Sequence, residues 1–174
     1  QNEINDGLSQ QVRITITPLK NWNIIGELNI KTDNNWTHYE HKRVYSHMAN
    51  DPEKTYVATM TGPSEDKVYE YAYKSLFLNP NVYTNYDIPL GQHTIAATAG
   101  MQTERQKYRD VSAQRADMIS TDLPVLNLTT SSQSYGISGV VQEWASAGFF
   151  GRINYDYAGR YLVEGNLRYD GVRP

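Results

Sequence analysis

The amino-acid sequence predicts an all-β protein of about six antiparallel strands, paired as three hairpins. Runs of alternating apolar and polar residues predict the strands, and short turn sequences between these runs predict the hairpins. A third observation is an excess of tyrosine, which supplies 14 of the 174 residues. We expect the hairpins at about 9–33, 75–103 and 146–170, and long polar loops at about 34–67 and 104–145.

The C-terminal hairpin has the clearest alternation. Every second residue from Tyr161 to Tyr169 is tyrosine, valine, glycine or leucine, and the residues between them are mostly polar. A period of two residues places the two sets on opposite faces of a strand. Residues 149–157 alternate in the same way, and residues 158–160 between the two runs predict a tight turn because they contain glycine.

Two upstream segments repeat this pattern. The first has its turn near Lys20, between alternating residues 12–17 and 22–32. The second has its turn near Leu90, and its strands alternate in the same manner. The three turns are widely spaced along the chain, so two long connections separate the three hairpins.

The second long connection contains residues that favour a helix. The segment from Glu104 to Val111 is rich in good helix formers, and one face of such a helix would carry Tyr108, Val111, Arg115 and Met118. Pro124 follows shortly afterwards and limits the length of such a helix. The sequence therefore predicts one short helix near 104–118.

Composition excludes several classes of protein. The formal net charge is −3 and no basic block occurs, which argues against nucleic-acid binding. The chain has no cysteine, so disulfide scaffolds, cysteine nucleophiles and thiolate metal sites are excluded. No apolar run approaches the roughly 18 residues of a transmembrane helix, and the N-terminal residues do not have the pattern of a signal peptide.

No sequence motif predicts catalysis, a cofactor or a metal. His38 and His41 are three residues apart, but no carboxylate cluster completes a metal site. The carboxylates of Asp156, Glu164 and Asp170 alternate with arginine and asparagine, which favours cross-strand ion pairs over a catalytic pair. We therefore expect a protein that is not an enzyme and that uses no cofactor.

Two interpretations of the alternating strands are open at this point. A soluble β-sandwich that binds carbohydrate would bury one face of each strand in a core. A transmembrane β-barrel would turn that face to lipid and the polar face to the lumen, with short turns at one end and long loops at the other. Aromatic residues beside the turns fit the barrel, because tyrosine and tryptophan gather at membrane interfaces. They are Trp22, Tyr86, Tyr155, Tyr157 and Tyr161.

The last part of the chain carries a resemblance to a known family. Residues 148–157 (GFFGRINYDY), 160–162 (RYL) and 167–171 (LRYDG) look like a barrel hairpin of the SusC/RagA family. Residues 14–26 and 86–104 resemble two upstream hairpins of that family, in the same order and with the same spacing. Its members are TonB-dependent transporters of the bacterial outer membrane, which import glycans or peptides.

This resemblance implies that residues 1–174 are a single partial segment of a much longer protein, with a barrel of about 22 strands. It implies a parent importer that takes up glycans, oligosaccharides or peptides through the outer-membrane bilayer. The implied partners are a SusD-like surface lipoprotein and the TonB energy-coupling complex. Six strands cannot close a barrel of that size, so we expect the isolated chain to self-associate.

Two sets of residues are the site candidates. Polar side chains on one face of the C-terminal hairpin are expected to face the lumen: Arg152, Asn154, Asp156, Glu164, Asn166, Arg168 and Asp170. Aromatic residues of the long loops are expected at the extracellular mouth, where their rings could stack on sugars: Trp36, Tyr39, Tyr45 and Tyr108. The alternative for the first set is a ladder of ion pairs that sets the strand register. The alternative for the second is burial within the loops.

Overall fold

The computed structural model describes residues 2–57, 65–131 and 136–173. Within these residues the chain forms strands and no helix. In the same part of the chain, no helix is long and apolar enough to cross a membrane. The strands are β1 (Asn2–Leu19), β2 (Trp22–His41), β3 (Tyr45–Met48), β4 (Asp51–Val57), β5 (Lys67–Leu90), β6 (His93–Ala116), β7 (Gly136–Tyr157) and β8 (Tyr161–Arg173).

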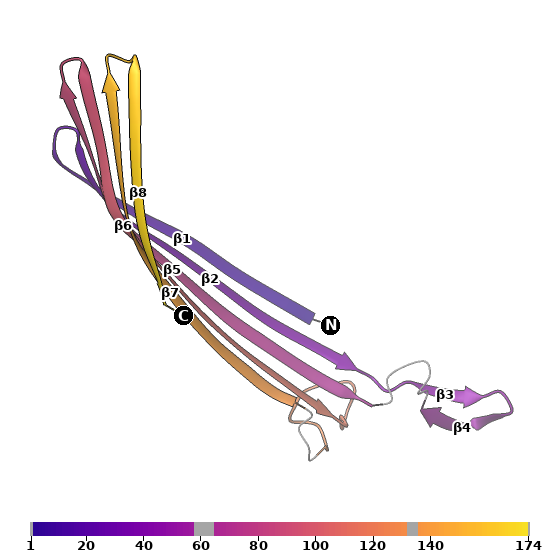
Figure 1. Cartoon of the computed structure of the whole chain (residues 1–174). Helices are drawn as coiled ribbons and strands as arrows, with labels where there is room; N and C mark the ends of the chain where they lie inside the picture. The colour runs from indigo at the N-terminus through magenta and orange to yellow at the C-terminus, as the bar shows by residue number, and fades with distance from the viewer. Residues whose placement is uncertain (1, 58–64, 132–135, 174) are drawn as a thin grey trace. The chain divides into compact units, whose positions relative to one another are not determined.

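Six of these strands form one antiparallel sheet in the order β1-β2-β5-β6-β7-β8. The neighbours follow chain order, except that β3 and β4 pair with each other as a separate antiparallel hairpin (Figure 1). The predicted all-β fold, with six strands paired as consecutive hairpins, is confirmed.

Three tight turns join the strands in pairs, where the sequence predicted them. Figure 1 shows the three turns at the same end of the sheet. Asn21 in the first turn has a φ of 66° and Gly91 in the second has a φ of 65°, a backbone conformation that these residue types tolerate. In the third turn, residues 158–160, the N–H of Gly159 donates to Asp156 Oδ1 at 2.7 Å.

The chain divides into two compact units. The turn unit contains the three turns and the adjoining parts of the strands. It consists of Gly7–Asp33, Ser75–Tyr108 and Gln142–Pro174. The loop unit contains β3, β4 and the remaining parts, namely Gln1–Asp6, Asn34–Lys74 and Arg109–Val141. That residues 1–174 form one barrel segment stays a prediction.

The helix predicted near 104–118 is wrong, because these residues continue β6 as far as Ala116. Gln106 on β6 donates from Nε2 to Ser75 Oγ on β5 at 3.3 Å, and its Oε1 accepts from Trp144 Nε1 on β7 at 3.0 Å. β6 is a central strand with a paired neighbour on each side. Pairing on both sides outweighs the helix preference of the individual residues.

The strands are also longer than the predicted hairpins, so the loops expected at 34–67 and 104–145 are too wide. The first loop contains the β3–β4 hairpin, and its residues 58–64 lie outside the described residues. Residues 132–135 of the second loop also lie outside them. The strand ends that differ are His41 of β2, Lys67 of β5, Ala116 of β6 and Gly136 of β7.

The described residues contain almost no hydrophobic core. Their buried hydrophobic residues are Ile25, Val68 and Ala116. A β-sandwich needs two sheets that bury their facing apolar sides against each other. Here the second sheet is the short β3–β4 hairpin. The structure therefore does not favour the sandwich interpretation.

The two faces of β7 and β8 differ in chemistry. The strands pair without a shift from Ala145↔Arg173 to Tyr157↔Tyr161. We call one side of the sheet in the turn unit the apolar face, and here it carries Phe149↔Tyr169, Gly151↔Leu167, Ile153↔Gly165, Tyr155↔Val163 and Tyr157↔Tyr161. We call the opposite side the polar face, and here it carries Gly148↔Asp170, Phe150↔Arg168, Arg152↔Asn166 and Asn154↔Glu164.

Candidate functional site

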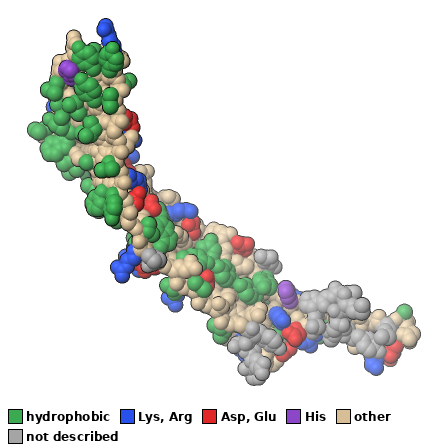
Figure 2. All heavy atoms as spheres, viewed as in Figure 1, with side chains coloured by type: hydrophobic (Ala, Val, Ile, Leu, Met, Phe, Trp, Pro, Cys, Tyr) green, Lys and Arg blue, Asp and Glu red, His purple; other side chains and the backbone are tan. Residues whose placement is uncertain are grey.

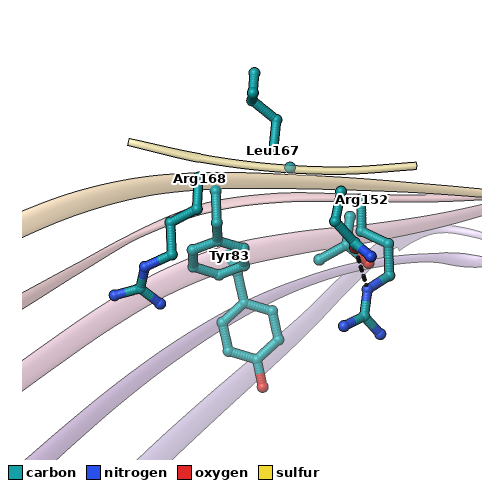
Figure 3. A pocket seen from close by; sticks show the side chains of 8 residues that line it. Tyr83, Arg152, Leu167 and Arg168 are labelled. Carbon is teal, nitrogen blue, oxygen red and sulfur yellow. Dashed lines mark hydrogen bonds between the residues drawn. The ribbon is translucent and has the colours of Figure 1, made fainter. Parts of the chain in front are cut away.

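The polar face of β7 and β8 brings together the side chains that the sequence selected. Arg152 Nε donates to Asn166 Oδ1 on the neighbouring strand at 2.9 Å, and lies 3.8 Å from Glu164 Oε1. Asn166 Nδ2 donates to Glu164 Oε1 at 2.6 Å. Figure 3 shows Arg152 and Arg168 projecting to one side of the sheet and Leu167 to the other. The alternation read from the sequence therefore separates the two sets of side chains in space.

The other polar candidates on these strands have different roles. Arg168 Nε donates to the two carboxylate oxygens of Asp170 at 3.0 and 2.8 Å, which is a pair within one strand. Asn154 is partly buried on the same face. Asp156 accepts the N–H of Gly159 and thereby closes the turn, so its role is structural. That this face lines a lumen stays a prediction.

A hollow of about 550 Å³ adjoins these arginines. Its lining includes Tyr83 and Phe150, whose ring centroids lie 6.5 Å apart. The Cβ atom of Tyr83 and the ring of Phe150 lie against Gly100 of β6. A Cβ atom at this position would lie 2.5 Å from Tyr83 Cβ and 2.8 Å from Phe150 Cζ, closer than real Cβ atoms approach. Glycine is therefore required next to these two side chains, and no pattern in the sequence marks this position.

Polar contacts continue across the sheet on β1, β2 and β5. Glu27 Oε1 accepts from Tyr83 OH at 3.0 Å and pairs with Arg13 Nε at 2.6 Å. The buried Asn79 accepts from Asn29 Nδ2 at 3.1 Å. The sequence analysis did not select these residues, although the alternation of their own strands already places them on one face.

The apolar face leaves large hydrophobic side chains uncovered. Leu167, Val163 and Ile153 are 79%, 65% and 59% exposed. Figure 2 shows hydrophobic side chains gathered over the part of the chain that holds the three turns. Contiguous apolar patches on soluble monomers rarely exceed a few hundred Å². An apolar environment is therefore expected to cover this face.

A row of aromatic side chains lies on the apolar face beside the turns. Trp22 and Tyr86 meet edge to face with ring centroids 6.3 Å apart. The ring of His93 lies 4.9 Å from that of Tyr157, and its Nδ1 lies 2.7 Å from Tyr155 OH. Such rings combine an apolar body with a polar tip, which suits a boundary between lipid and water. We call this row the turn-side belt: Trp22, Tyr86, His93, Tyr155, Tyr157 and Tyr161.

The apolar face has the length of a bilayer crossing. At one end, the rings of Tyr157 and Tyr161 stack with centroids 6.4 Å apart. At the other end, Phe149 pairs with Tyr169 across the two strands. From one end to the other, β8 has about nine residues, and a tilted transmembrane strand needs about 9–11.

The aromatic candidates lie on strands, which corrects their expected position in loops, and that they stand at the extracellular mouth stays a prediction. Trp36 Nε1 donates to Glu70 Oε2 at 2.9 Å, and Tyr39 stacks on Tyr69 with ring centroids 4.5 Å apart. The strands continue beyond the segments in which apolar and polar residues alternate. At these positions most residues on both faces are polar, so the sequence pattern no longer indicates a strand. The four candidates are distributed as follows: Trp36 and Tyr39 in β2, Tyr45 in β3 and Tyr108 in β6.

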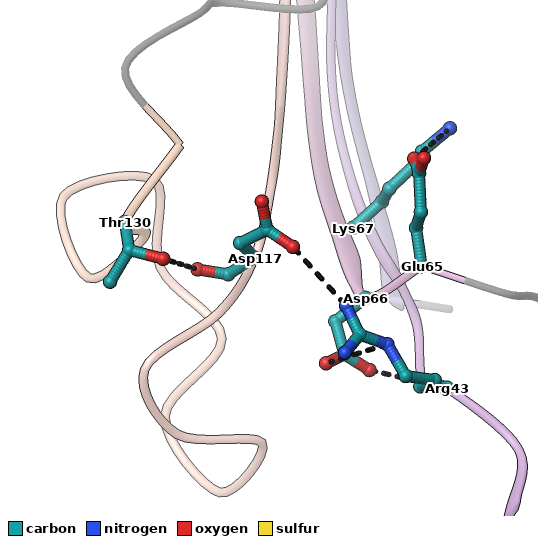
Figure 4. Close-up of polar contacts among 6 residues, drawn as sticks. All are labelled: Arg43, Glu65, Asp66, Lys67, Asp117 and Thr130. Atoms are coloured by element: carbon teal, nitrogen blue, oxygen red, sulfur yellow. Dashed lines mark hydrogen bonds and ion pairs between the residues drawn. The ribbon is translucent and has the colours of Figure 1, made fainter. Parts of the chain in front are cut away.

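In the loop unit, Arg43 joins three segments that are far apart in sequence. Its Nη2 lies 3.2 Å from Asp117 Oδ1 and its Nε 3.8 Å from Asp66 Oδ2 (Figure 4). The carbonyl of Asp117 also accepts the N–H of Thr130 at 2.8 Å. Burial by itself lowers the pKa of Arg43, but attraction to the two carboxylates and to Tyr45 outweighs it, so the pKa is raised. This network fixes the strand ends.

A small ionic cluster lies on β6 and β7 in the turn unit. Arg105 Nε donates to Glu143 Oε1 at 2.6 Å, and Lys107 Nζ lies 3.3 Å from Glu143 Oε2. The hydrogen bond from Arg105 lowers the pKa of Glu143 below its ordinary value. Desolvation opposes this effect, and the hydrogen bond from Lys107 adds to it.

Glu143→Gln is expected to lower thermal stability at neutral pH and to have no effect in acid. A carboxylate whose folded pKa is lowered stabilises the protein above its unfolded pKa, and this contribution is lost as the pH falls through the folded pKa. The measurement is the thermal midpoint of wild type and variant in detergent between about pH 3 and pH 7. A difference in midpoint that is the same at every pH would contradict the ionic role of Glu143.

Within the described ranges, no group of three or more histidine, cysteine, aspartate or glutamate side chains is placed to hold a metal ion. His38 Nδ1 instead lies 2.6 Å from Glu70 Oε1, and the ring of His41 lies 5.4 Å from that of Tyr39. These two histidines therefore make local contacts within the loop unit.

Comparisons with known proteins complete the description. No family model matches the chain. A curated relative, the TonB-dependent receptor P3 of Formosa agariphila, is 23% identical over 117 residues, which make up 67% of this chain and 12% of that protein. The solved structure of the RagAB peptide transporter aligns with a TM-score of 0.75 at 20% identity, covering 98% of this chain and 18% of that chain.

Two further structures show the RagAB peptide importer in its closed-closed and open-open states, and each aligns with a TM-score of 0.74 at 19% identity and the same coverage. The chain spans less than a fifth of the length of these relatives. The chain therefore has the fold of part of these RagAB structures over nearly its whole length, which agrees with the resemblance of its three hairpins to the SusC/RagA family.

Proposed function

We propose that the chain forms part of the barrel wall of a TonB-dependent nutrient importer in the bacterial outer membrane. The observation that carries this proposal is the apolar face. It exposes large hydrophobic side chains over the length of a bilayer crossing, with aromatic residues at both ends. A sheet that crosses a membrane needs one face of this kind, because alternate residues contact lipid.

In this proposal the polar face lines the lumen. Its side chains include cations, carboxylates and amides close together, among them Arg152, Glu164 and Asn166. Such a mixed wall can hydrogen-bond the backbone of a peptide or the hydroxyl groups of an oligosaccharide. We therefore propose a peptide or glycan as the imported solute, and a transport role without catalysis.

The partners follow from the same proposal. A SusD-like surface lipoprotein would deliver the solute, and the TonB complex would supply the energy for transport. In the six-stranded sheet, β1 and β8 are the edge strands and each has an unpaired side. Unpaired edges and an uncovered apolar face favour association, so the isolated chain is expected to self-associate.

Cysteine scanning of adjacent positions tests this orientation, since the chain has no cysteine of its own. Single cysteines would replace Asn154, Asn166, Ile153 or Leu167 in the parent protein, freed of any other cysteine. In intact membranes, a small water-soluble thiol reagent is expected to label positions 154 and 166 at least tenfold faster than 153 and 167. The reason is that water reaches a lumen wall and not a lipid-facing side chain.

The same variants in denaturant provide the control, because all four cysteines should then react at one rate. Equal labelling of neighbouring positions in the folded protein would contradict the proposal, since both faces would then contact water.

A further inference from the structure

Four charged residues lie on the apolar side of the sheet, beyond the Phe149↔Tyr169 pair that ends the apolar face of β7 and β8. We call them the rim cluster: Arg105, Lys107, Glu143 and Arg173. Glu143 pairs with Arg105 and with Lys107, as described above. Arg173 lies directly across from Ala145, which is two residues from Glu143 on the same face of β7.

The contacts of neighbouring residues show which side of the sheet the rim cluster occupies. Gln106 meets Trp144 across β6 and β7, and these positions share a face with Phe150. Arg105 and Glu143 are one residue away from this pair, so they lie on the opposite side. That side is the apolar face, to which β6 contributes His93 next to Tyr155.

The rim cluster has an excess of positive charge. Arg105 and Lys107 share the carboxylate of Glu143 and Arg173 adds a third cation, so the net charge is two positive charges (three minus one). Two cations compete for Glu143, and Arg105 and Lys107 each remain 50% exposed. The cluster can therefore accept a further anion without losing its internal pairs.

The backbone of the rim cluster lies at and beyond the level of lipid headgroups. Arg173 faces Ala145, which is four residues from Phe149, or about 13 Å along the strand and roughly 9 Å along the membrane normal at the usual tilt. Glu143 is six residues from Phe149, or about 20 Å along the strand and roughly 14 Å along the normal. The headgroup region extends about 5–7 Å beyond the hydrocarbon core on each side. Long basic side chains reach several ångströms back toward the core boundary. Between these levels, Ala147 faces Gly171, so that small side chains leave room for a headgroup.

We propose that the rim cluster binds the phosphate of an anionic lipid headgroup. Basic residues next to a membrane-spanning segment attract anionic lipids, and arginine and lysine both bind phosphate oxygens. This inference rests on the proposed function, because only a sheet that crosses a bilayer brings this side into contact with lipid.

The test uses the full-length parent protein in nanodiscs of phosphatidylcholine with a minor fraction of phosphatidylglycerol. Native mass spectrometry then counts the lipids that stay bound to the released protein. About fivefold preference for each of the two net positive charges predicts an enrichment of phosphatidylglycerol on the order of 25-fold. The variant Arg105→Gln/Lys107→Gln/Arg173→Gln should lose this enrichment.

A matched control removes three cations elsewhere in the turn unit, as Lys20→Gln/Lys31→Gln/Arg160→Gln, and should keep the enrichment. Glu143→Gln should increase it by about fivefold, because this change raises the net positive charge by one. If the triple variant of the rim cluster does not fold, Glu143→Gln still tests the inference.

Two outcomes would overturn the inference in different ways. Enrichment that is unchanged in the triple variant or in Glu143→Gln would overturn the headgroup site and leave the proposed function intact. A wild-type protein that cannot be recovered folded in nanodiscs would overturn the proposed function, and the headgroup site with it.

Discussion

Replacing Ile153 with arginine is expected to destabilise the folded protein in a bilayer by about 2–4 kcal/mol. Ile153 pairs with Gly165 midway between the aromatic residues at the two ends of the apolar face, and 59% of its surface is exposed there. An arginine at the middle of the hydrocarbon core has no water or counterion to solvate it. The loss corresponds to roughly 30-fold to several hundred-fold in the folding equilibrium.

The matched control is Asn154→Arg, one residue along β7 on the polar face. Asn154 lies across from Glu164, so an arginine there gains a carboxylate neighbour and should change stability by less than about 1 kcal/mol. Urea unfolding of the full-length protein in vesicles measures both variants. If the two arginines cost the same, the apolar face does not contact lipid.

Gly100→Leu is expected to disrupt the sheet locally. It should lower the free energy of unfolding by more than the about 1–3 kcal/mol that overpacking usually costs. The position lies beneath Tyr83 and Phe150, and the backbone carbonyl of Val82 is 2.8 Å from the position of a Cβ atom. The carbonyl belongs to the adjacent strand, so relief requires the strands to move apart. Gly100→Ala should give a smaller loss in the same direction.

Gly26→Leu is the control for this prediction, since a Cβ atom there would have nothing within 4 Å. It should leave unfolding in detergent almost unchanged. Comparable losses in Gly26→Leu and Gly100→Leu would show that strand glycines are required for their backbone and not for the close approach of Tyr83 and Phe150.

The sequence predicted the hairpins and the two faces because both are local properties. The alternation from Tyr161 to Tyr169 is enough to predict a strand and its two faces. A tight turn can likewise be predicted from its own few residues. For the same reason, Arg152 and Glu164 could be assigned to one face before their contacts were known. The resemblance to a family added the large barrel, which alternation alone did not distinguish from a sandwich.

The errors arose where the structure depends on residues far away in the chain. Glu104 to Ala116 favours a helix when taken alone, but two neighbouring strands hold it extended. The requirement for glycine at position 100 comes from Tyr83 and Phe150, which no local pattern connects with it. The contacts of Arg43 with Asp66 and Asp117 could not be predicted from the sequence for the same reason, because the three residues are far apart in the chain.

The unshifted pairing of β7 and β8 limits how this wall can change in evolution. One residue gained or lost within a strand would turn every side chain beyond it to the other face. An insertion early in β7, for example, would turn Arg152 to the side proposed to face lipid and Ile153 to the side proposed to face the lumen. Insertions and deletions are therefore expected in the turns, in the loops or in steps of two, and divergence inside the strands is expected to proceed by substitution.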